Sequence, residues 1–262
     1  MSEVMLSRRE GAVLILSNNN TAARNALSPE FYEALRQALR AAAADPSVGA
    51  VVLTGEGGHF CAGGDLRQLA TRRQLPESGR HERLADLNSL IRAVRDFPKP
   101  VIAAVEGAAA GAGLSLALAC DMLVAARNAV FSVAYVKVGL TPDGGATAFL
   151  SEFVSRQVLT ELCLTGERIS GERMQQLGCV NRLADAGQAL DAALALAAQI
   201  AEGPQQAMAS IKALCRASAH NSQDEQLELE AQYMVQAQVS DESLEGIGAF
   251  LEKRAPDYRK LR

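Results

Sequence analysis

One carboxylate of this 262-residue chain stands in a setting suited to proton transfer. Asp143 lies in GLTPDGGATAFL (139–150), between a proline and two glycines, just ahead of an apolar helical pattern. Pro-Asp-Gly-Gly is a strong turn sequence, and Asp often caps the start of a helix. Apolar neighbours such as Val138, Leu140 and Phe149 would instead raise the pKa of the carboxyl and make it a better general base. The residues alone therefore leave two interpretations of Asp143, a turn residue or a proton carrier.

Two glycine-rich turns offer a place for a substrate oxygen. GGHFCAGGDL (57–66) follows the apolar run 49–55, and GAAAGAGLSLALACD (107–121) follows a run that starts near Val101. The second turn leads into a helical pattern, whose first N–H groups are unpaired and lie at the positive end of its dipole. Two converging N–H donors would form an oxyanion hole. Close packing of backbone is the other interpretation. The glycines fit neither a P-loop nor a dinucleotide-binding fingerprint well.

The elements that must position these turns alternate between strand and helix. The segment 27–44 has helical spacing with a good start at Ser28-Pro29, and 70–98 opens with charged, turn-rich residues and continues as an amphipathic helix. We expect a mobile loop at the opening of 70–98. The buried strand candidates are 11–17, 49–55 and 99–107. This order predicts an α/β fold.

The C-terminal part changes character. Residues 188–218 and 222–252 are mostly helical in period, with breaks at Gly203-Pro204 and near His220-Asn221. We expect a core of residues 1–199 and a helical region of residues 200–262. No fixed repeat period or low-complexity linker divides the chain.

Composition excludes several classes of function. The 48% hydrophobic content supports a large core, and a net charge of −4 indicates no nucleic-acid partner. No long apolar run or signal-peptide pattern is visible, which predicts a cytoplasmic protein without a membrane partner. Five cysteines without C-x-x-C spacing and three scattered histidines predict reduced thiols, no metal site and no Ser-His-Asp triad.

Five motifs together resemble the crotonase family of acyl-CoA enzymes, in order from about residue 4 to 258. The motifs are RNALS (24–28), FCAGGDL (60–66), KPVIAAVEGAAAGAGLSLALACD (99–121), GLTPDGGATAFL (139–150) and FLEKR (250–254). The resemblance implies a spiral of ββα units with a C-terminal helical trimerisation region. It also implies a homotrimer, or a hexamer of two trimers.

The resemblance further implies a coenzyme A thioester as substrate, with coenzyme A as part of that substrate and no separate cofactor. Its carbonyl oxygen would lie between the N–H groups of Gly64 and Ala112, and Lys253 would come from a neighbouring subunit. The residues implied to contact substrate are Ala62, Asp65, Leu66, Ser115, Tyr135, Arg24, Phe250 and Lys253.

Each of these side chains also has a plain structural interpretation. Asp65 suits a helix cap, Ser115 helix packing, and Phe250 a packing contact, whereas Tyr135 would either form a wall of the acyl pocket, which is favoured, or direct a proton. Arg24 and Lys253 suit solvated surface charges. Outside this set, Asp121 and Glu106 are interpreted as structural and Cys61 as buried packing, because no histidine is placed to activate that thiol.

Two departures from the family pattern bear on the reaction. Hydratases of the family carry two glutamates that activate a water, and Ser115 and Tyr135 occupy those positions here. Asp143 instead matches isomerases that carry one acid in this turn, especially those of phenylacetate catabolism, which convert a ring epoxide to an oxepin thioester. The resemblance therefore implies an acyl-CoA isomerase that works through an enolate, with Asp143 as acid and base.

Other functions remain as alternatives. One is an enoyl-CoA hydratase with atypical residues. Another is a non-catalytic acyl-CoA-binding oligomer, which would need the glycine turns but no catalytic carboxylate. Dehalogenation of an aroyl-CoA is disfavoured, because those relatives have a Trp at the position of Tyr135 and a His in the helix that here reads Asp86-Leu87-Asn88.

Overall fold

A six-stranded sheet forms the centre of the computed structural model, which describes residues 4–262. Its strand order is β1-β2-β3-β4-β6-β9; β1 is antiparallel to β2, and the other neighbours are parallel. The strands are β1 (Met5–Glu10), β2 (Val13–Asn18), β3 (Ala50–Gly55), β4 (Val101–Val105), β6 (Met122–Ala126) and β9 (Arg182–Ala184). The three strands expected from apolar runs are thus β2, β3 and β4. Their runs are continuous because a parallel strand is buried on both faces.

A second, smaller sheet lies beside the first. It has the order β5-β7-β8, with β7 parallel to β5 and antiparallel to β8. Its strands are β5 (Ala108–Ala110), β7 (Val130–Ser132) and β8 (Ile169–Ser170). β5 directly follows β4 in the chain, so the apolar run near residue 101 leads from the large sheet into the small one.

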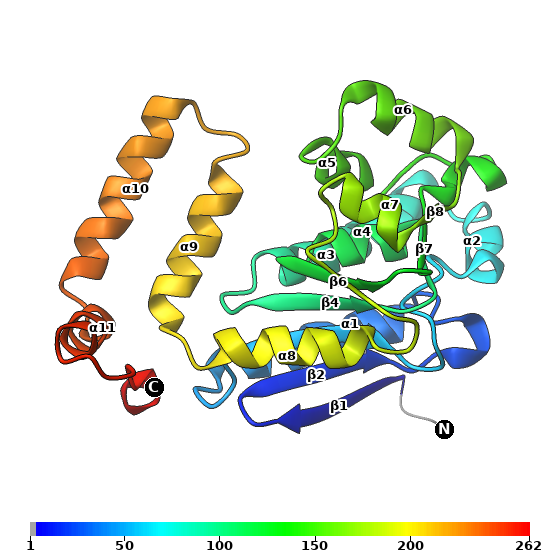
Figure 1. The fold of residues 1–262 in the computed structure, drawn as a ribbon. Coiled ribbons are helices and arrows are strands. Elements are labelled where there is room, and N and C mark those ends of the chain that lie inside the picture. The colour runs from blue at the N-terminus through cyan, green and yellow to red at the C-terminus, as the bar shows by residue number, and fades with distance from the viewer. Residues whose placement is uncertain (1–3) are drawn as a thin grey trace.

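Helices cover the large sheet on both faces (Figure 1). Ile15, Val52 and Ile102 pack with helix α8, whereas their sequence neighbours Leu16 and Val51 point to the other face, in one cluster with residues of α1, α3 and α4. The helices of this part are α1 (Pro29–Ala44), α2 (Leu66–Arg72), α3 (Glu77–Arg95), α4 (Ala112–Leu118), α5 (Ala146–Ser151), α6 (Arg156–Thr165), α7 (Gly171–Gln176) and α8 (Ala189–Ala201). The 3₁₀ helices are η1 (Thr21–Ala23), η2 (Ala134–Val138) and η3 (Tyr258–Leu261).

Local chemistry sets the ends of α1 and α2. Ser28 caps α1 by accepting a hydrogen bond from the N–H of Phe31 at 3.3 Å, as its place before Pro29 predicts. The segment expected to open as a loop is shorter than predicted. α2 runs to Arg72, and only residues 73–76 separate it from α3, because the cap at the start of α2 lies upstream of the charged stretch.

The three C-terminal helices extend from one side of the sheet (Figure 1). They are α9 (Gln205–Ala217), α10 (Gln223–Gln238) and α11 (Asp241–Leu251). The breaks fall at Gly203-Pro204 and near His220-Asn221, as expected from the sequence. Glu242 of α11 accepts hydrogen bonds from two N–H groups in the first turn of α9, both at 2.9 Å, and so links these helices. The division into units 1–199 and 200–262 stays a prediction.

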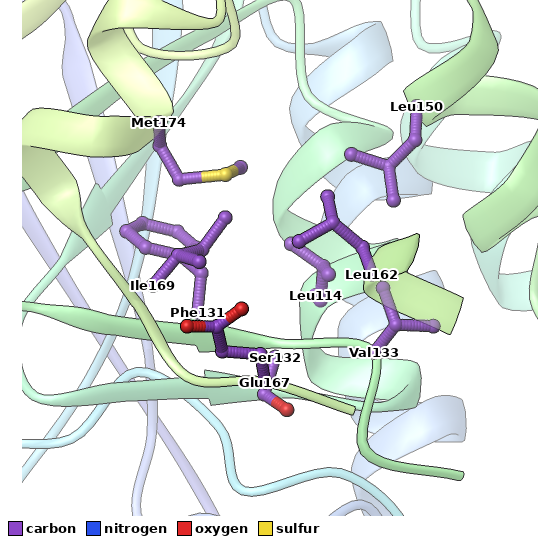
Figure 2. Close-up of a pocket in the computed structure, with 9 residues that line it drawn as sticks. All are labelled: Leu114, Phe131, Ser132, Val133, Leu150, Leu162, Glu167, Ile169 and Met174. Atoms are coloured by element: carbon purple, nitrogen blue, oxygen red, sulfur yellow. The ribbon is translucent and has the colours of Figure 1, made fainter. Parts of the chain in front are cut away.

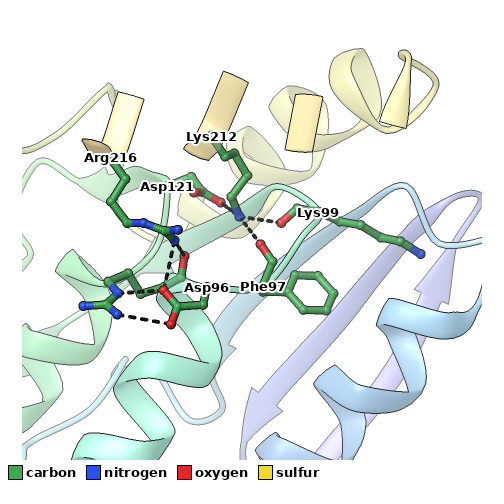
Figure 3. A network of polar contacts seen from close by, with 7 residues as sticks. Asp96, Phe97, Lys99, Asp121, Lys212 and Arg216 are labelled. Carbon is green, nitrogen blue, oxygen red and sulfur yellow. Dashed lines mark hydrogen bonds and ion pairs between the residues drawn. The ribbon is translucent and has the colours of Figure 1, made fainter. Parts of the chain in front are cut away.

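A partly buried lysine joins α9 to the sheet. The Nζ of Lys212 lies 2.6 Å from the carboxylate of Asp121 and donates to the carbonyl oxygens of Phe97 and Lys99, both at 2.7 Å (Figure 3). All three donors of the ammonium group are therefore used within the protein.

Residues 4–262 contain neither a helix with the length and apolar character needed to cross a bilayer nor a cluster of three metal-ligating side chains.

Candidate active site

The two glycine-rich turns lie against each other. The N–H of Cys61 donates to the carbonyl oxygen of Ala108 at 2.9 Å, and the N–H of Ala110 donates to the carbonyl oxygen of Cys61 at 3.0 Å. Glycine is required at this junction. A Cβ on Gly63, where φ is +99°, would lie 2.7 Å from the Ala110 oxygen, and one on Gly113 would lie 2.4 Å from the Cys61 oxygen.

This junction brings two backbone donors into one neighbourhood. Ala112 is the first residue of α4, so its N–H has no partner in the helix. Among residues 4–262 no acceptor is found for the N–H of Gly64. A Cβ on Gly63 would lie 3.7 Å from the Ala112 nitrogen. The two turns are therefore close enough for one substrate oxygen to contact both. An oxygen that gains negative charge there could be stabilised by both N–H groups.

Asp143 is held beside these turns through α4 and η2. The Tyr135 hydroxyl donates to Asp143 Oδ1 at 2.8 Å, and the Ser115 hydroxyl donates to the Asp143 carbonyl oxygen at 3.0 Å. Ser115 is fully buried and lies one turn after Ala112 in α4. Asp143 Oδ2 has no hydrogen-bond partner in the described part of the chain. One oxygen of the carboxylate is thus fixed and the other is available.

The backbone of Asp143 makes a turn, but its side chain does not cap a helix. Its carbonyl oxygen accepts from the N–H of Ala146 at 3.2 Å. α5 begins at Ala146 with Gly145 at the cap position and no side-chain cap, so the alternative interpretation of Asp143 as a helix cap does not hold. Gly144 has φ of +58°, and a Cβ there would lie 3.2 Å from that of Ser115. This glycine lets the turn approach α4 closely.

Burial controls the electrostatics of the site. It raises the pKa of Asp143 above its usual range, whereas the hydrogen bond from Tyr135 and the charge of Arg72 act in the opposite direction. Burial and the nearby Asp143 charge also raise the pKa of Tyr135, so its phenol stays protonated and remains a donor. Arg72 was not predicted from the sequence, since a basic residue in the last turn of a helix carries no distinctive spacing.

The structural interpretations of several acids are confirmed. Asp65 Oδ1 caps α2 by accepting from the N–H of Arg67 at 2.8 Å. Asp121 accepts from the N–H of Val101 at 2.7 Å, and Glu106 from the N–H of Ala189 at 2.8 Å. Each carboxylate therefore satisfies a backbone donor.

The thiol of Cys61 fits its packing role. It is buried, and burial raises its pKa to about 12, which makes a nucleophilic thiolate unfavourable.

The residues expected to contact coenzyme A fall into two groups. Arg24 is exposed next to the first turn, where its carbonyl oxygen accepts from the N–H of Ala62 at 3.0 Å, and Leu66 is exposed on α2. Phe250 and Lys253 lie on α11 and just after it, on the opposite side of the molecule from α2 and α5 (Figure 1). A single chain does not bring these two groups together, and the contribution of Lys253 from a neighbouring subunit stays a prediction.

An apolar pocket lies next to α4, between the small sheet and the helices α5 to α7 (Figure 2). Its space is too narrow for a water molecule. The lining residues are Leu114, Phe131, Ser132, Val133, Leu150, Leu162, Glu167, Ile169 and Met174. Because Leu114 and Ser115 are neighbours in α4, this close packing supports the helix that holds the Asp143 turn.

Comparison with known proteins identifies the class. The profile of the enoyl-CoA hydratase/isomerase family matches residues 8–261, so the chain belongs to this family, a part of the crotonase superfamily. It is 36% identical to 1,2-epoxyphenylacetyl-CoA isomerase of Escherichia coli K12 over 98% of this chain and 99% of that protein. It is also 36% identical to 2,3-dehydroadipyl-CoA hydratase of the same organism over 99% of each.

A solved structure extends the comparison to the fold. An enoyl-CoA hydratase from Polaromonas sp. JS666 has a TM-score of 0.94 and 47% identity, covering 97% of this chain and 98% of that one. The expected α/β crotonase-like fold is therefore confirmed.

Proposed function

We propose that this member of the family is an acyl-CoA isomerase that shifts a double bond, or rearranges a ring-epoxide thioester, through an enolate. The observation that carries the proposal is the arrangement of Asp143, with one oxygen held by Tyr135 and the other available beside two glycine turns. The carbonyl oxygen of a bound thioester would accept from the N–H groups of Gly64 and Ala112. Those donors would stabilise the negative charge that develops when a proton leaves the carbon chain.

The proton balance needs only one acid-base group. Asp143 Oδ2 would remove a proton from the carbon between the thioester carbonyl and a 3,4 double bond, and the electrons would delocalise onto the carbonyl oxygen. The same oxygen would then return the proton two carbons further along, leaving a 2,3 double bond. No atom is gained or lost, and no cofactor is required.

The same geometry disfavours hydration. Water addition in the two-glutamate enzymes uses carboxylates at the positions of Ser115 and Tyr135. Both side chains here are neutral and donate hydrogen bonds to Asp143. The isomerase and the hydratase of Escherichia coli are both 36% identical to this chain, so comparison with these two relatives does not separate the two reactions. We expect hydration of 2-enoyl-CoA to be much slower than in a two-glutamate enzyme assayed beside it.

The test is a product assay over 3-enoyl, 2-enoyl and epoxyaryl thioesters of coenzyme A, with the wild type and Asp143→Asn. We expect isomerised products from the wild type and a fall of about 10² to 10⁴ in Asp143→Asn, the usual loss for a general base. Asp185→Asn is the matched control, because Asp185 is an exposed acid whose side chain is 88% accessible.

Thermal stability and ligand affinity are measured on the same preparations. A folded Asp143→Asn protein with wild-type turnover would remove Asp143 from the mechanism. Strong hydration would support the hydratase alternative, and binding without any turnover would support the non-catalytic one.

A further inference from the structure

We propose that Tyr135 is a positioning residue for this reaction, whose phenolic O–H holds Asp143 by Oδ1 and so presents Oδ2 to the substrate. The inference rests on the proposed function, since it requires Asp143 to be the base. It assigns Tyr135 a different role from the pocket wall that its residue type suggests.

The Tyr135 hydroxyl is itself held in place. Tyr135 is 8% exposed, its hydroxyl lies 3.5 Å from Ser115 Oγ, and its carbonyl oxygen accepts from the N–H of Leu140 at 3.0 Å. Its ring faces the second glycine turn, where a Cβ on Gly111 would lie 3.8 Å from Tyr135 Cζ. The phenol thus bridges the turn that offers the Ala112 N–H and the carboxylate. A rigid ring makes a precise donor, because few torsions have to be ordered.

The two oxygens of Asp143 are made unequal by this bond. The hydroxyl of Tyr135 is 2.8 Å from Oδ1 and 3.2 Å from the Asp143 carbonyl oxygen, so it contacts both ends of the residue. Of the Asp143 atoms, Ser115 contacts only the carbonyl oxygen, at 3.0 Å, and its Oγ also lies 3.5 Å from the Tyr135 hydroxyl. Ser115 therefore anchors the turn, whereas Tyr135 fixes the rotation of the carboxylate. Loss of that restraint would let the carboxylate rotate away from the geometry needed for proton transfer.

The charged and titratable groups around Asp143 determine the expected sign of a pH effect. Tyr135 on η2 contacts it, and Arg72 on α2 and Tyr32 on α1 interact with it electrostatically; Tyr32 also interacts electrostatically with Cys61 and Asp86. In the described residues, Tyr135 is the side chain that donates a hydrogen bond to the carboxylate. Removing this donor leaves burial opposed by Arg72 alone, so the pKa of Asp143 rises further. Because the base must be ionised, the acid limb of the pH profile of kcat/KM moves to higher pH.

The experiment measures double-bond migration against pH for Tyr135→Phe, which keeps the ring and removes the hydroxyl. We expect kcat to fall about tenfold with KM changed less than about twofold, and the acid limb to move up by about one pH unit. Tyr32→Phe is the matched control. It removes a phenol that interacts electrostatically with the same carboxylate but makes no hydrogen bond to it, so we expect no shift of the acid limb.

A second variant makes the opposite prediction and preserves the shape of the side chain. The variant Tyr135→3-fluorotyrosine has a more acidic phenol, which is therefore a stronger hydrogen-bond donor to Asp143. The acid limb should then move to lower pH. This variant also decides the question if Tyr135→Phe does not fold.

Several outcomes would overturn the inference. An unmoved acid limb with unchanged kcat in either variant would show that the hydroxyl does not act on Asp143. A raised KM with normal kcat would show a pocket wall instead. These failures are separate from that of the proposed function. An inactive Asp143→Asn beside a fully active Tyr135→Phe removes only the role of Tyr135.

Discussion

At the scale of the residue, ionisation of Asp143 is the property that the site controls most directly. Burial opposes the charged form, whereas Tyr135 and Arg72 favour it, and burial is the largest of these effects. To act as a base, Asp143 must be in its ionised form. The site thus combines a raised pKa with a fixed carboxylate, the two properties that general-base catalysis uses.

This balance predicts the pH dependence of the wild type. The pKa of Asp143 is raised, so kcat/KM for isomerisation should fall on acidification with a midpoint above the ordinary 3.8. The measurement is a pH profile of kcat/KM over the range in which circular dichroism shows folded protein. A midpoint at or below 3.8 would contradict the dominance of burial.

At the scale of the element, Lys212 is the main polar link between α9 and the sheet. Its side chain is 13% exposed, and its partner Asp121 follows α4, the helix that carries Ser115. Removing one member of a largely desolvated pair is costly because it leaves the other charge unpaired. The pair therefore ties the C-terminal helices to the part of the core that supports the site.

Lys212→Met should consequently lower the free energy of unfolding by about 3 kcal/mol. Arg216→Met is the control on the same helix. Arg216 pairs with Asp96 at 2.9 Å, but both side chains are 45% exposed, and such a pair contributes less than about 1 kcal/mol. Urea denaturation of both variants measures the difference. Equal losses of unfolding free energy in the two variants would show that the lower exposure of Lys212 does not determine its contribution to stability.

At the scale of the whole molecule, α10 and α11 carry large apolar side chains that one chain leaves exposed. The large exposed apolar side chains of these helices are Leu227, Met234, Val235, Leu244, Ile247, Phe250 and Leu251. Apolar patches of this kind mark sites of protein association. Together with the family membership, they support the proposal that the protein assembles as a trimer or hexamer.

This proposal predicts the effect of a charge in the surface. Ile247→Glu should shift the assembly toward monomer, because a carboxylate would be buried without a partner on association. Multi-angle light scattering measures the mass of wild type and variant over a range of concentrations. A monomeric wild type at every concentration would contradict the proposal.

Much of this architecture follows from local sequence patterns. The apolar runs of β2 to β4, the cap at Ser28 and the breaks at Gly203-Pro204 and His220-Asn221 act over a few residues, so they can be identified from the sequence. The two glycine turns were also identified, because small residues after a strand are a local signal. The antiparallel strand β1 and the full extent of α2 were not predicted. The pairing of β1 with β2 and the packing of α2 beside the site both depend on contacts that a local pattern does not show.

The arrangement of the site was decided by tertiary structure. Asp143 and Tyr135 were singled out by residue type and family resemblance, but the bond between them could not be predicted from either. Ser115 is 28 residues from Asp143, and Tyr135 lies 8 residues from it with η2 and a turn between. Whether the Asp143 side chain caps α5 or faces a phenol depends on how closely Gly144 approaches α4. Sequence by itself determined which groups are present. Only the packing of the turn on α4 decided which oxygen of Asp143 is bound and which is available, because hydrogen-bond geometry is set by distances that folding alone establishes.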